Sequence, residues 1–152
     1  DVRGIRYPGL ISWQSPVSGG TTDYAVDIFH FALSNEQSYE CFVRRDTKLP
    51  MMYMDDAIRA TISLMNQPLE SLSSARCGYN ISGISFTAEE LSSQIKNHIP
   101  NFICTYKPDV RQIYADSWPD SIDDTIAKKD WNWSPNFQLV DIVEDMIKNL
   151  KE

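Results

Sequence analysis

The hydrophobic pattern is clearest between Tyr24 and Leu33, where most positions are apolar. Tyr24, Ile28 and Ala32 recur at the spacing of one helix face, and the apolar residues beside them widen that face. Because little of the segment stays polar, the pattern predicts a mostly buried helix over 24–33. Thr22 or Asp23 is suitably placed to cap its first turn.

A strand end and a long loop are expected before this helix. The run from Val2 to Tyr7 is rich in β-branched and aromatic residues but does not alternate, which is typical of a parallel strand covered on both faces. Pro8 and Gly9 then end the run, because proline cannot donate a sheet hydrogen bond and glycine permits a sharp exit. Residues 12–20 are rich in serine, glycine and proline, which predicts a loop.

The middle of the chain predicts two strands and a helix. Strands are expected over 39–43 and 49–54, and a helix from Asp55 to the break at Pro68. The residues expected on its buried face are Ile58, Thr61, Ile62 and Met65. Asp55 and Asp56 could be paired catalytic carboxylates, but at a helix start we interpret them as partners of the helix dipole.

The strongest local signal in the chain is a capping box. Thr87 and Glu90 have the spacing at which each side chain bonds the other's backbone, while Phe86 and Leu91 form a hydrophobic staple. A helix is therefore expected from Thr87 towards Pro100. A short strand is predicted over 79–82, a half-buried strand over 102–106 and a final amphipathic helix over 139–150.

Composition indicates one globular domain that does not bind polyanions. The chain has 152 residues, 42% hydrophobic content and a formal charge of −7. Binding to nucleic acid or an anionic membrane needs clustered Lys and Arg, which are scattered here, so we expect neither partner. No apolar run reaches the ~18 residues that a membrane span requires.

Cysteine and histidine do not predict a metal site. The cysteines, Cys41, Cys77 and Cys104, are odd in number and widely spaced, which argues against a disulfide framework and indicates a reducing, intracellular compartment. His30 and His98 lie far apart, and each is expected to be an ordinary helix residue. Trp131 and Trp133 are expected to be packing residues, whereas the role of Trp118 stays open.

The loop before the first helix has the chemistry to bind a small zwitterion. Free backbone N–H groups at a helix start favour an anion, the hydroxyls of Thr21 and Thr22 can donate to one, and Asp23 could attract an ammonium group. The alternative is that Gly19 to Asp23 is an ordinary loop followed by an N-cap.

Six segments of the chain resemble a known family. RYPGLIS, GGTTDYAVDIF, LPMMYMDDAIRA, YNISGISFTAEEL, DSWPDSIDD and KKDWNW are similar to L-threonine 3-dehydrogenases of the short-chain type, in the extended short-chain dehydrogenase/reductase superfamily with nucleotide-sugar epimerases and dehydratases. The family's glycine-rich turn and its Tyr-x-x-x-Lys pair do not occur in this sequence. We therefore interpret residues 1–152 as the carboxyl-terminal portion of such an enzyme, with residues 1–11 ending its Rossmann domain and a small mixed α/β substrate-binding domain following.

The resemblance implies an NAD-dependent parent enzyme that oxidises L-threonine to 2-amino-3-ketobutyrate, with this portion inactive alone. It implies cofactor contacts at Pro8, Gly9 and Leu10, a substrate lining at Gly20, Thr21 and Thr22, and a cover at Trp118, with no catalytic residue or metal here. A homodimeric parent is expected, mitochondrial in a eukaryote and cytoplasmic in a bacterium. The alternatives are part of a nucleotide-sugar epimerase or dehydratase, with Arg111 as its phosphate contact, and a non-catalytic remnant.

Overall fold

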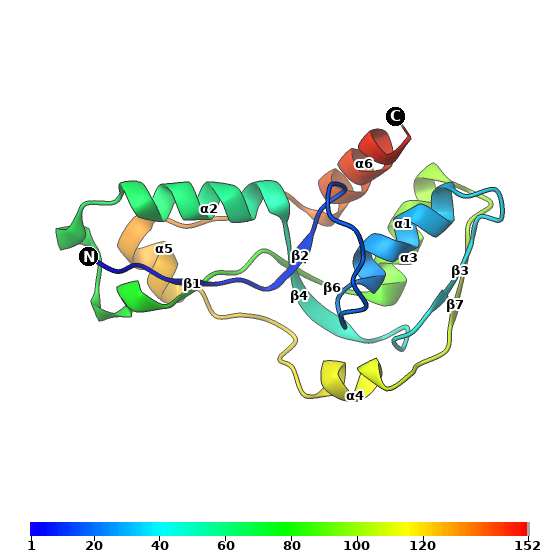
Figure 1. Cartoon of the computed structure of the whole chain (residues 1–152), viewed down its shortest axis with the longest axis horizontal. Coiled ribbons are helices and arrows are strands. Elements are labelled where there is room, and N and C mark those ends of the chain that lie inside the picture. Colours follow the sequence, from blue (N-terminus) through cyan, green and yellow to red (C-terminus); the bar gives the residue numbers. More distant parts are fainter. Residues whose placement is uncertain (152) are drawn as a thin grey trace.

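A computed structural model describes residues 1–151 as an elongated α/β molecule with two lobes (Figure 1). The strands are β1 (Ile5–Arg6), β2 (Gly9–Ile11), β3 (Ser38–Cys41), β4 (Lys48–Tyr53), β5 (Tyr79–Asn80), β6 (Ile84–Thr87) and β7 (Ile103–Tyr106). The α-helices are α1 (Tyr24–Leu33), α2 (Met54–Asn66), α3 (Ala88–His98), α4 (Arg111–Asp116), α5 (Thr125–Trp131) and α6 (Leu139–Leu150). Short 3-10 turns cover Leu69–Ser71 and Ser74–Cys77.

The strands form three small sheets. β1 pairs with β5 in parallel, and β3 pairs with β7 in parallel. In the third sheet β4 is central, parallel to β2 and antiparallel to β6. The chain therefore leaves β1 at Pro8 and enters a different sheet at Gly9, so that the break expected at Tyr7-Pro8-Gly9 is a crossing from one lobe to the other.

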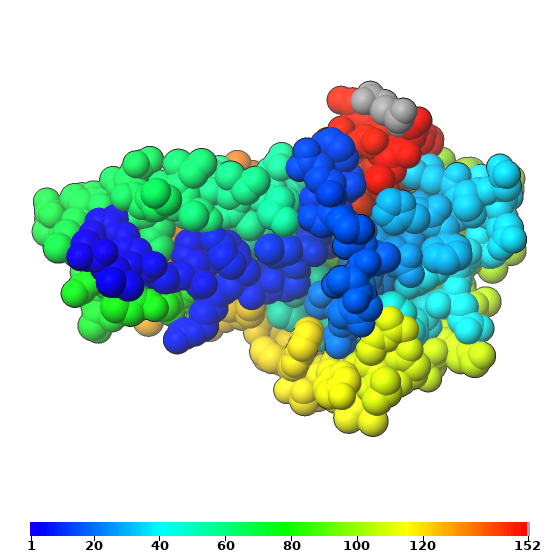
Figure 2. All heavy atoms as spheres, viewed as in Figure 1, coloured from blue at the N-terminus to red at the C-terminus, as the bar shows by residue number. Residues whose placement is uncertain are grey.

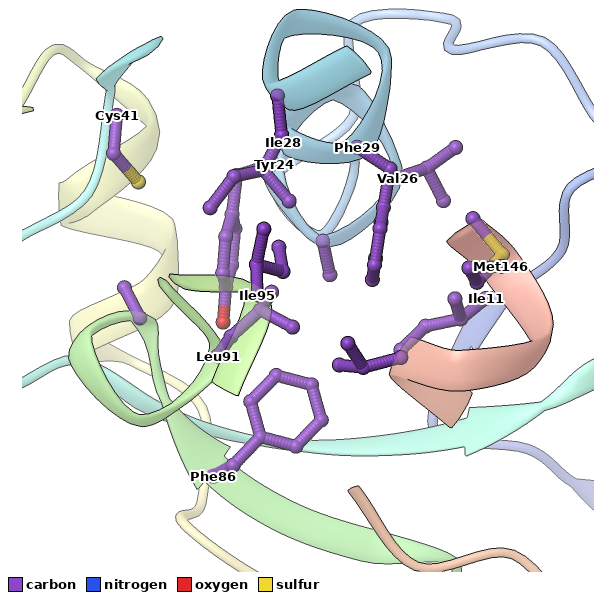
Figure 3. Packing of buried hydrophobic residues seen from close by; sticks show 14 of the residues in the cluster. Ile11, Tyr24, Val26, Ile28, Phe29, Cys41, Phe86, Leu91, Ile95 and Met146 are labelled. Carbon is purple, nitrogen blue, oxygen red and sulfur yellow. The ribbon is translucent and has the colours of Figure 1, made fainter. Parts of the chain in front are cut away.

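The larger core lies where α1, α3 and α6 cover the β2-β4-β6 sheet. Ile28 and Phe29 of α1 point at Leu91 and Ile95 of α3, and Phe86 closes the layer from β6 (Figure 3). The helix expected over 24–33 is confirmed in both its bounds and its burial. Since α1 is anchored along most of its length, the loop that leads into it ends at a fixed point.

The smaller core joins α2 and α5 to the β1-β5 pair. Trp131 and Trp133 are buried in it, as expected for packing residues, with ring centroids 5.5 Å apart. The indole N–H of Trp133 donates to the carbonyl of Ser82 at 2.9 Å, which ties the segment after α5 to the strand region after β5.

Both carboxyl-terminal predictions about helices are confirmed. Thr87 and Glu90 make the reciprocal capping box at the start of α3, and Phe86 and Leu91 are both buried beside it. α6 has the predicted bounds. The capping box was sufficient to place the start of α3, and the periodic pattern was sufficient to place α6.

The predicted buried face of α2 is wrong. Ile58, Ile62 and Met65 are 50%, 54% and 68% exposed, whereas Ala57, Ala60 and Leu64 are buried. The helix carries two apolar stripes, and the smaller side chains of the second stripe allow the close approach to the sheets. The strand expected over 2–7 is shorter than predicted, because only Ile5 and Arg6 pair with β5.

Two short helices between residues 110 and 135 were not predicted. α4 and α5 have six and seven residues, too few for a clear periodic signal. No helix within the described residues is long and apolar enough to cross a bilayer.

Candidate functional site

The candidate site begins at Gly9, the first residue of β2. A Cβ at this position would lie 2.5 Å from Met51 Sδ on β4 and 2.7 Å from Thr22 Cγ2 in the loop before α1. Real Cβ atoms do not make such contacts, so any larger residue at this position would force the side chain of Met51 or Thr22 to shift. Gly9 therefore brings the start of β2 and Thr22 into direct contact.

The exposed apolar stripe of α2 carries a groove of about 390 Å³. A separate pocket of about 340 Å³ opens beside Gly9. Its lining comes from four separate segments: Tyr7, Pro8, Gly9, Thr22, Pro50, Trp118, Pro119 and Ile122. Most of this lining is apolar, and Tyr7 and Thr22 are its hydroxyl-bearing residues. The loop and the 110–122 segment lie next to each other on the face shown in Figure 2.

Four of the residues expected in the site line this one pocket. Pro8 and Gly9, the expected cofactor contacts, Thr22 of the expected substrate lining and Trp118, the expected cover, all contribute to its wall. The structure thus brings together residues more than a hundred positions apart.

The other three expected residues lie outside the pocket lining. Leu10 is on β2 with 37% of its surface exposed, and Gly20 and Thr21 belong to the loop that leads to Thr22. Their roles stay predictions. Tyr7, Pro50, Pro119 and Ile122 line the pocket but were not identified from the sequence.

Tyr7 is fixed by a contact that no local pattern reveals. Its hydroxyl hydrogen bonds to the hydroxyl of Thr61 on α2. The pocket wall is therefore attached to the smaller lobe as well as to β2.

The loop is held by Asp23. Its Oδ2 atom accepts backbone N–H groups of Ser18, Gly19 and Gly20 at 2.6, 2.8 and 3.0 Å. Asp23 occupies the N-cap position of α1, as one of the two expected capping residues. Its side chain makes no capping hydrogen bond to the helix. Partial burial raises the pKa of Asp23, but the hydrogen bonds from Ser18, Gly20 and Gly19 outweigh burial and leave this pKa below its ordinary value.

Trp118 is positioned by the end of α4. Its N–H donates to the carbonyl of Ala115 at 3.1 Å, and its side chain is 44% exposed. α4 is anchored through buried Gln112, whose Oε1 accepts the N–H of Arg44 at 2.6 Å and the hydroxyl of Thr47 at 3.0 Å. This buried amide supports the part of the pocket wall that follows α4.

Arg111 is not directed towards this pocket. Its guanidinium pairs with Asp109, with Nε 3.0 Å from both carboxylate oxygens, and stacks on Phe42 at 3.2 Å from the ring centroid. It lines a separate recess with Asp27 and Tyr39. Within residues 1–151, no three His, Cys, Asp or Glu side chains lie close enough together to hold a metal ion.

Comparison with known proteins gives consistent relatives, although no family model matches the chain. The mitochondrial L-threonine 3-dehydrogenase of Bos taurus is 51% identical over 97% of this chain and 39% of its own length. An uncharacterized epimerase/dehydratase of Staphylococcus haemolyticus is 44% identical over 100% of this chain and 48% of its own length.

A solved structure agrees with these relatives. The GalE-like L-threonine dehydrogenase from Cupriavidus necator, in its holo form, superposes with a TM-score of 0.95 and 54% identity, over 99% of this chain and 48% of that protein. The chain thus spans less than half the length of these proteins. In sequence and in fold, the chain therefore corresponds to a portion, less than half as long, of L-threonine 3-dehydrogenases of the GalE-like type.

Proposed function

We propose that this chain is the substrate-binding portion of an NAD-dependent L-threonine 3-dehydrogenase. The observation that carries the proposal is the pocket in which Gly9, Thr22 and Trp118 meet. The names of relatives more than 40% identical over nearly the whole chain support the same assignment.

The proposed reaction oxidises the β-hydroxyl of L-threonine to a ketone and gives 2-amino-3-ketobutyrate. The substrate loses a hydride and a proton, and NAD, when bound, supplies the hydride acceptor. This sequence has neither a Tyr-x-x-x-Lys pair nor a glycine-rich turn. Proton transfer and most of the cofactor binding are therefore assigned to the rest of the enzyme, and the 152-residue chain alone is expected to be inactive.

The residues present fit the nicotinamide end of the cofactor. Pro8 and Gly9 offer an apolar wall with no side chain beyond the proline ring, and Leu10 follows them on β2. Thr22, with Thr21 and Gly20 before it, would bind the amino acid beside that wall. Trp118 would cover both and exclude water.

Steady-state kinetics of the complete protein test this proposal. It should reduce NAD with L-threonine and show no activity with UDP-sugars. Trp118→Ala should raise KM for threonine about tenfold or more, because the pocket loses its cover. Tyr114→Ala is the matched control, since Tyr114 is an exposed aromatic on α4 outside the pocket. Turnover of UDP-sugars without turnover of threonine would contradict the proposal.

A nucleotide-sugar epimerase or dehydratase is the second candidate, favoured by the name of the Staphylococcus haemolyticus relative. Its substrate carries a diphosphate, and Arg111 was the expected phosphate contact. The engagement of Arg111 with Asp109 and Phe42 weakens this candidate. The same kinetic assay distinguishes the two.

A non-catalytic remnant is a further alternative for the chain by itself. Isothermal titration of the 152-residue species with NAD is expected to show no binding in the micromolar range. Micromolar binding would contradict the view that the cofactor is held mainly by residues outside this chain. The homodimeric state and the mitochondrial or bacterial cytoplasmic compartment stay part of the proposal for the complete enzyme.

A further inference from the structure

We propose that Asp23 is a positioning residue of the amino-acid site, which holds the Ser18–Gly20 loop so that Thr22 stays seated against Gly9. This inference rests on the proposed function and extends it to a side chain outside the pocket lining. It differs from the expectation that Asp23 attracts the substrate's ammonium group, which stays a prediction.

Asp23 anchors the Ser18–Gly20 loop through its carboxylate. Besides the three backbone N–H groups, the Ser18 hydroxyl lies 3.4 Å from the same Oδ2 atom, and the N–H of Asp23 donates to the Gly20 carbonyl at 3.2 Å. Within residues 1–151, every hydrogen bond that Ser18, Gly19 and Gly20 make involves Asp23. Removing this carboxylate would leave the loop with no partner for those N–H groups except water.

The loop backbone is shaped to converge on the carboxylate. Gly19 has φ +94°, a conformation that glycine adopts without strain. A Cβ on Gly20 would lie 3.1 Å from Asp23 Oδ1, so the second glycine allows the carboxylate to approach its own loop. Charge-assisted hydrogen bonds are stronger than neutral ones, which suits a single group that must hold three donors.

The anchored loop leads directly into Thr22. On one side of Thr22 the loop is tied to Asp23, and on the other the Thr22 carbonyl accepts the N–H of Ala25 in α1 at 3.1 Å. α1 itself is fixed in the larger core. Thr22 is therefore restrained from both directions, and its methyl group lies against Gly9.

This arrangement leaves Oδ2 of Asp23 fully occupied by the protein. An ammonium group at that oxygen would have to compete with donors already at 2.6–3.0 Å. In this proposal the carboxylate acts through the loop backbone that Oδ2 holds, so its removal should affect threonine and NAD unequally.

Kinetics of the complete enzyme test the inference. Asp23→Ala should raise KM for L-threonine about tenfold or more, Asp23→Asn should have a smaller effect because its amide oxygen accepts as a neutral group, and KM for NAD should change less than about twofold. Glu36→Ala removes an exposed carboxylate just after α1 and should leave both constants unchanged.

Amide hydrogen exchange of the same variants gives a readout independent of activity. The N–H groups of Ser18, Gly19 and Gly20 should exchange faster in Asp23→Ala than in the wild type, while those in the core of α1 keep their protection. Unchanged exchange would overturn the proposed anchor whatever the enzyme's substrate is. Faster exchange with an unchanged threonine KM would overturn the positioning role but leave the proposed function intact, and a wild type inactive on threonine would overturn both.

Discussion

At the scale of single residues, the site depends on Gly9, which has no side chain, and in our proposal on Asp23, whose side chain acts through the loop backbone. Pro8, Gly9, Thr22 and Trp118 could be identified from short motifs that resemble a family, and they do line one pocket. The proposed role of Asp23 as a loop anchor could not be identified from the sequence, because a capping residue and a loop anchor have the same local sequence. Nor could the contact between Tyr7 and Thr61, since it depends on how two lobes pack.

Gly9→Ala tests the close approach at β2. The new methyl group would overlap Met51 and Thr22, and overpacking of this kind usually costs about 1–3 kcal/mol. Chemical denaturation should show this loss in the free energy of unfolding. Gly19→Ala offers a comparison, because its Cβ would meet nothing within 4 Å and any loss there would come from the positive φ alone. A Gly9→Ala protein as stable as the wild type would contradict the packing described.

The two threonines should differ in their effect on substrate binding. In the complete enzyme, Thr22→Ala should raise KM for threonine more than KM for NAD, because Thr22 lines the pocket. Thr21→Ala should raise it too if both hydroxyls contact the substrate. An unchanged threonine KM in either variant would remove that residue from the proposed site.

At the scale of elements, local chemistry predicted helix ends better than helix faces. The capping box fixed the start of α3, and the periodic pattern gave α1 and α6 their bounds. The buried face of α2 was predicted wrongly because the helix has two apolar stripes. Which stripe is buried depends on packing partners that a periodic pattern does not reveal.

Asp56 on α2 has a role that its position at a helix start conceals. It is buried, and its carboxylate accepts N–H groups of Asn136 and Phe137 as well as the guanidinium of Arg59. These bonds tie the segment before α6 to α2 and support the interpretation of Asp56 as a structural rather than a catalytic carboxylate.

Asp56→Ala should lower the free energy of unfolding by about 2 kcal/mol, because part-buried backbone donors lose a buried, charged acceptor. Asp55→Ala, one residue earlier and exposed, should change it by less than about 0.5 kcal/mol. Urea denaturation of both variants measures the difference. Equal effects would show that the buried carboxylate contributes nothing beyond its place in the first turn.

At the scale of the whole molecule, the two lobes meet along β1, β2 and the loop before α1 (Figure 1). Residues of this region, Tyr7, Pro8, Gly9 and Thr22, line the pocket. The fold class could be predicted from alternating strands and helices. The arrangement in three small sheets could not, because the crossing at Pro8 is decided by long-range pairing of β1 with β5 and of β2 with β4.

Buried tyrosines make the stability of the whole chain sensitive to alkaline pH. Burial raises the pKa of Tyr24 and of Tyr53, and it raises the pKa of Tyr106 to about 12. An unfolded tyrosine titrates near pH 10, so the unfolded chain releases protons first and stability is lost as pH rises above that value. Below pH 10 this contribution is complete.

The free energy of unfolding should therefore fall by about 1 kcal/mol or more for each pH unit between 10 and 12. Denaturation at several pH values measures the slope, and Tyr106→Phe should reduce it. A flat profile across this range would contradict the burial of these hydroxyls.

The central claim is that an amino acid binds between Gly9, Thr22 and Trp118 beside the nicotinamide of NAD. The most direct measurement is a crystal structure of the complete protein with NAD and L-threonine or an unreactive analogue. We predict the amino acid within hydrogen-bond distance of Thr22 and beneath Trp118, with the nicotinamide ring against Pro8 and Gly9. An amino acid bound elsewhere, with this pocket filled only by water, would contradict the claim.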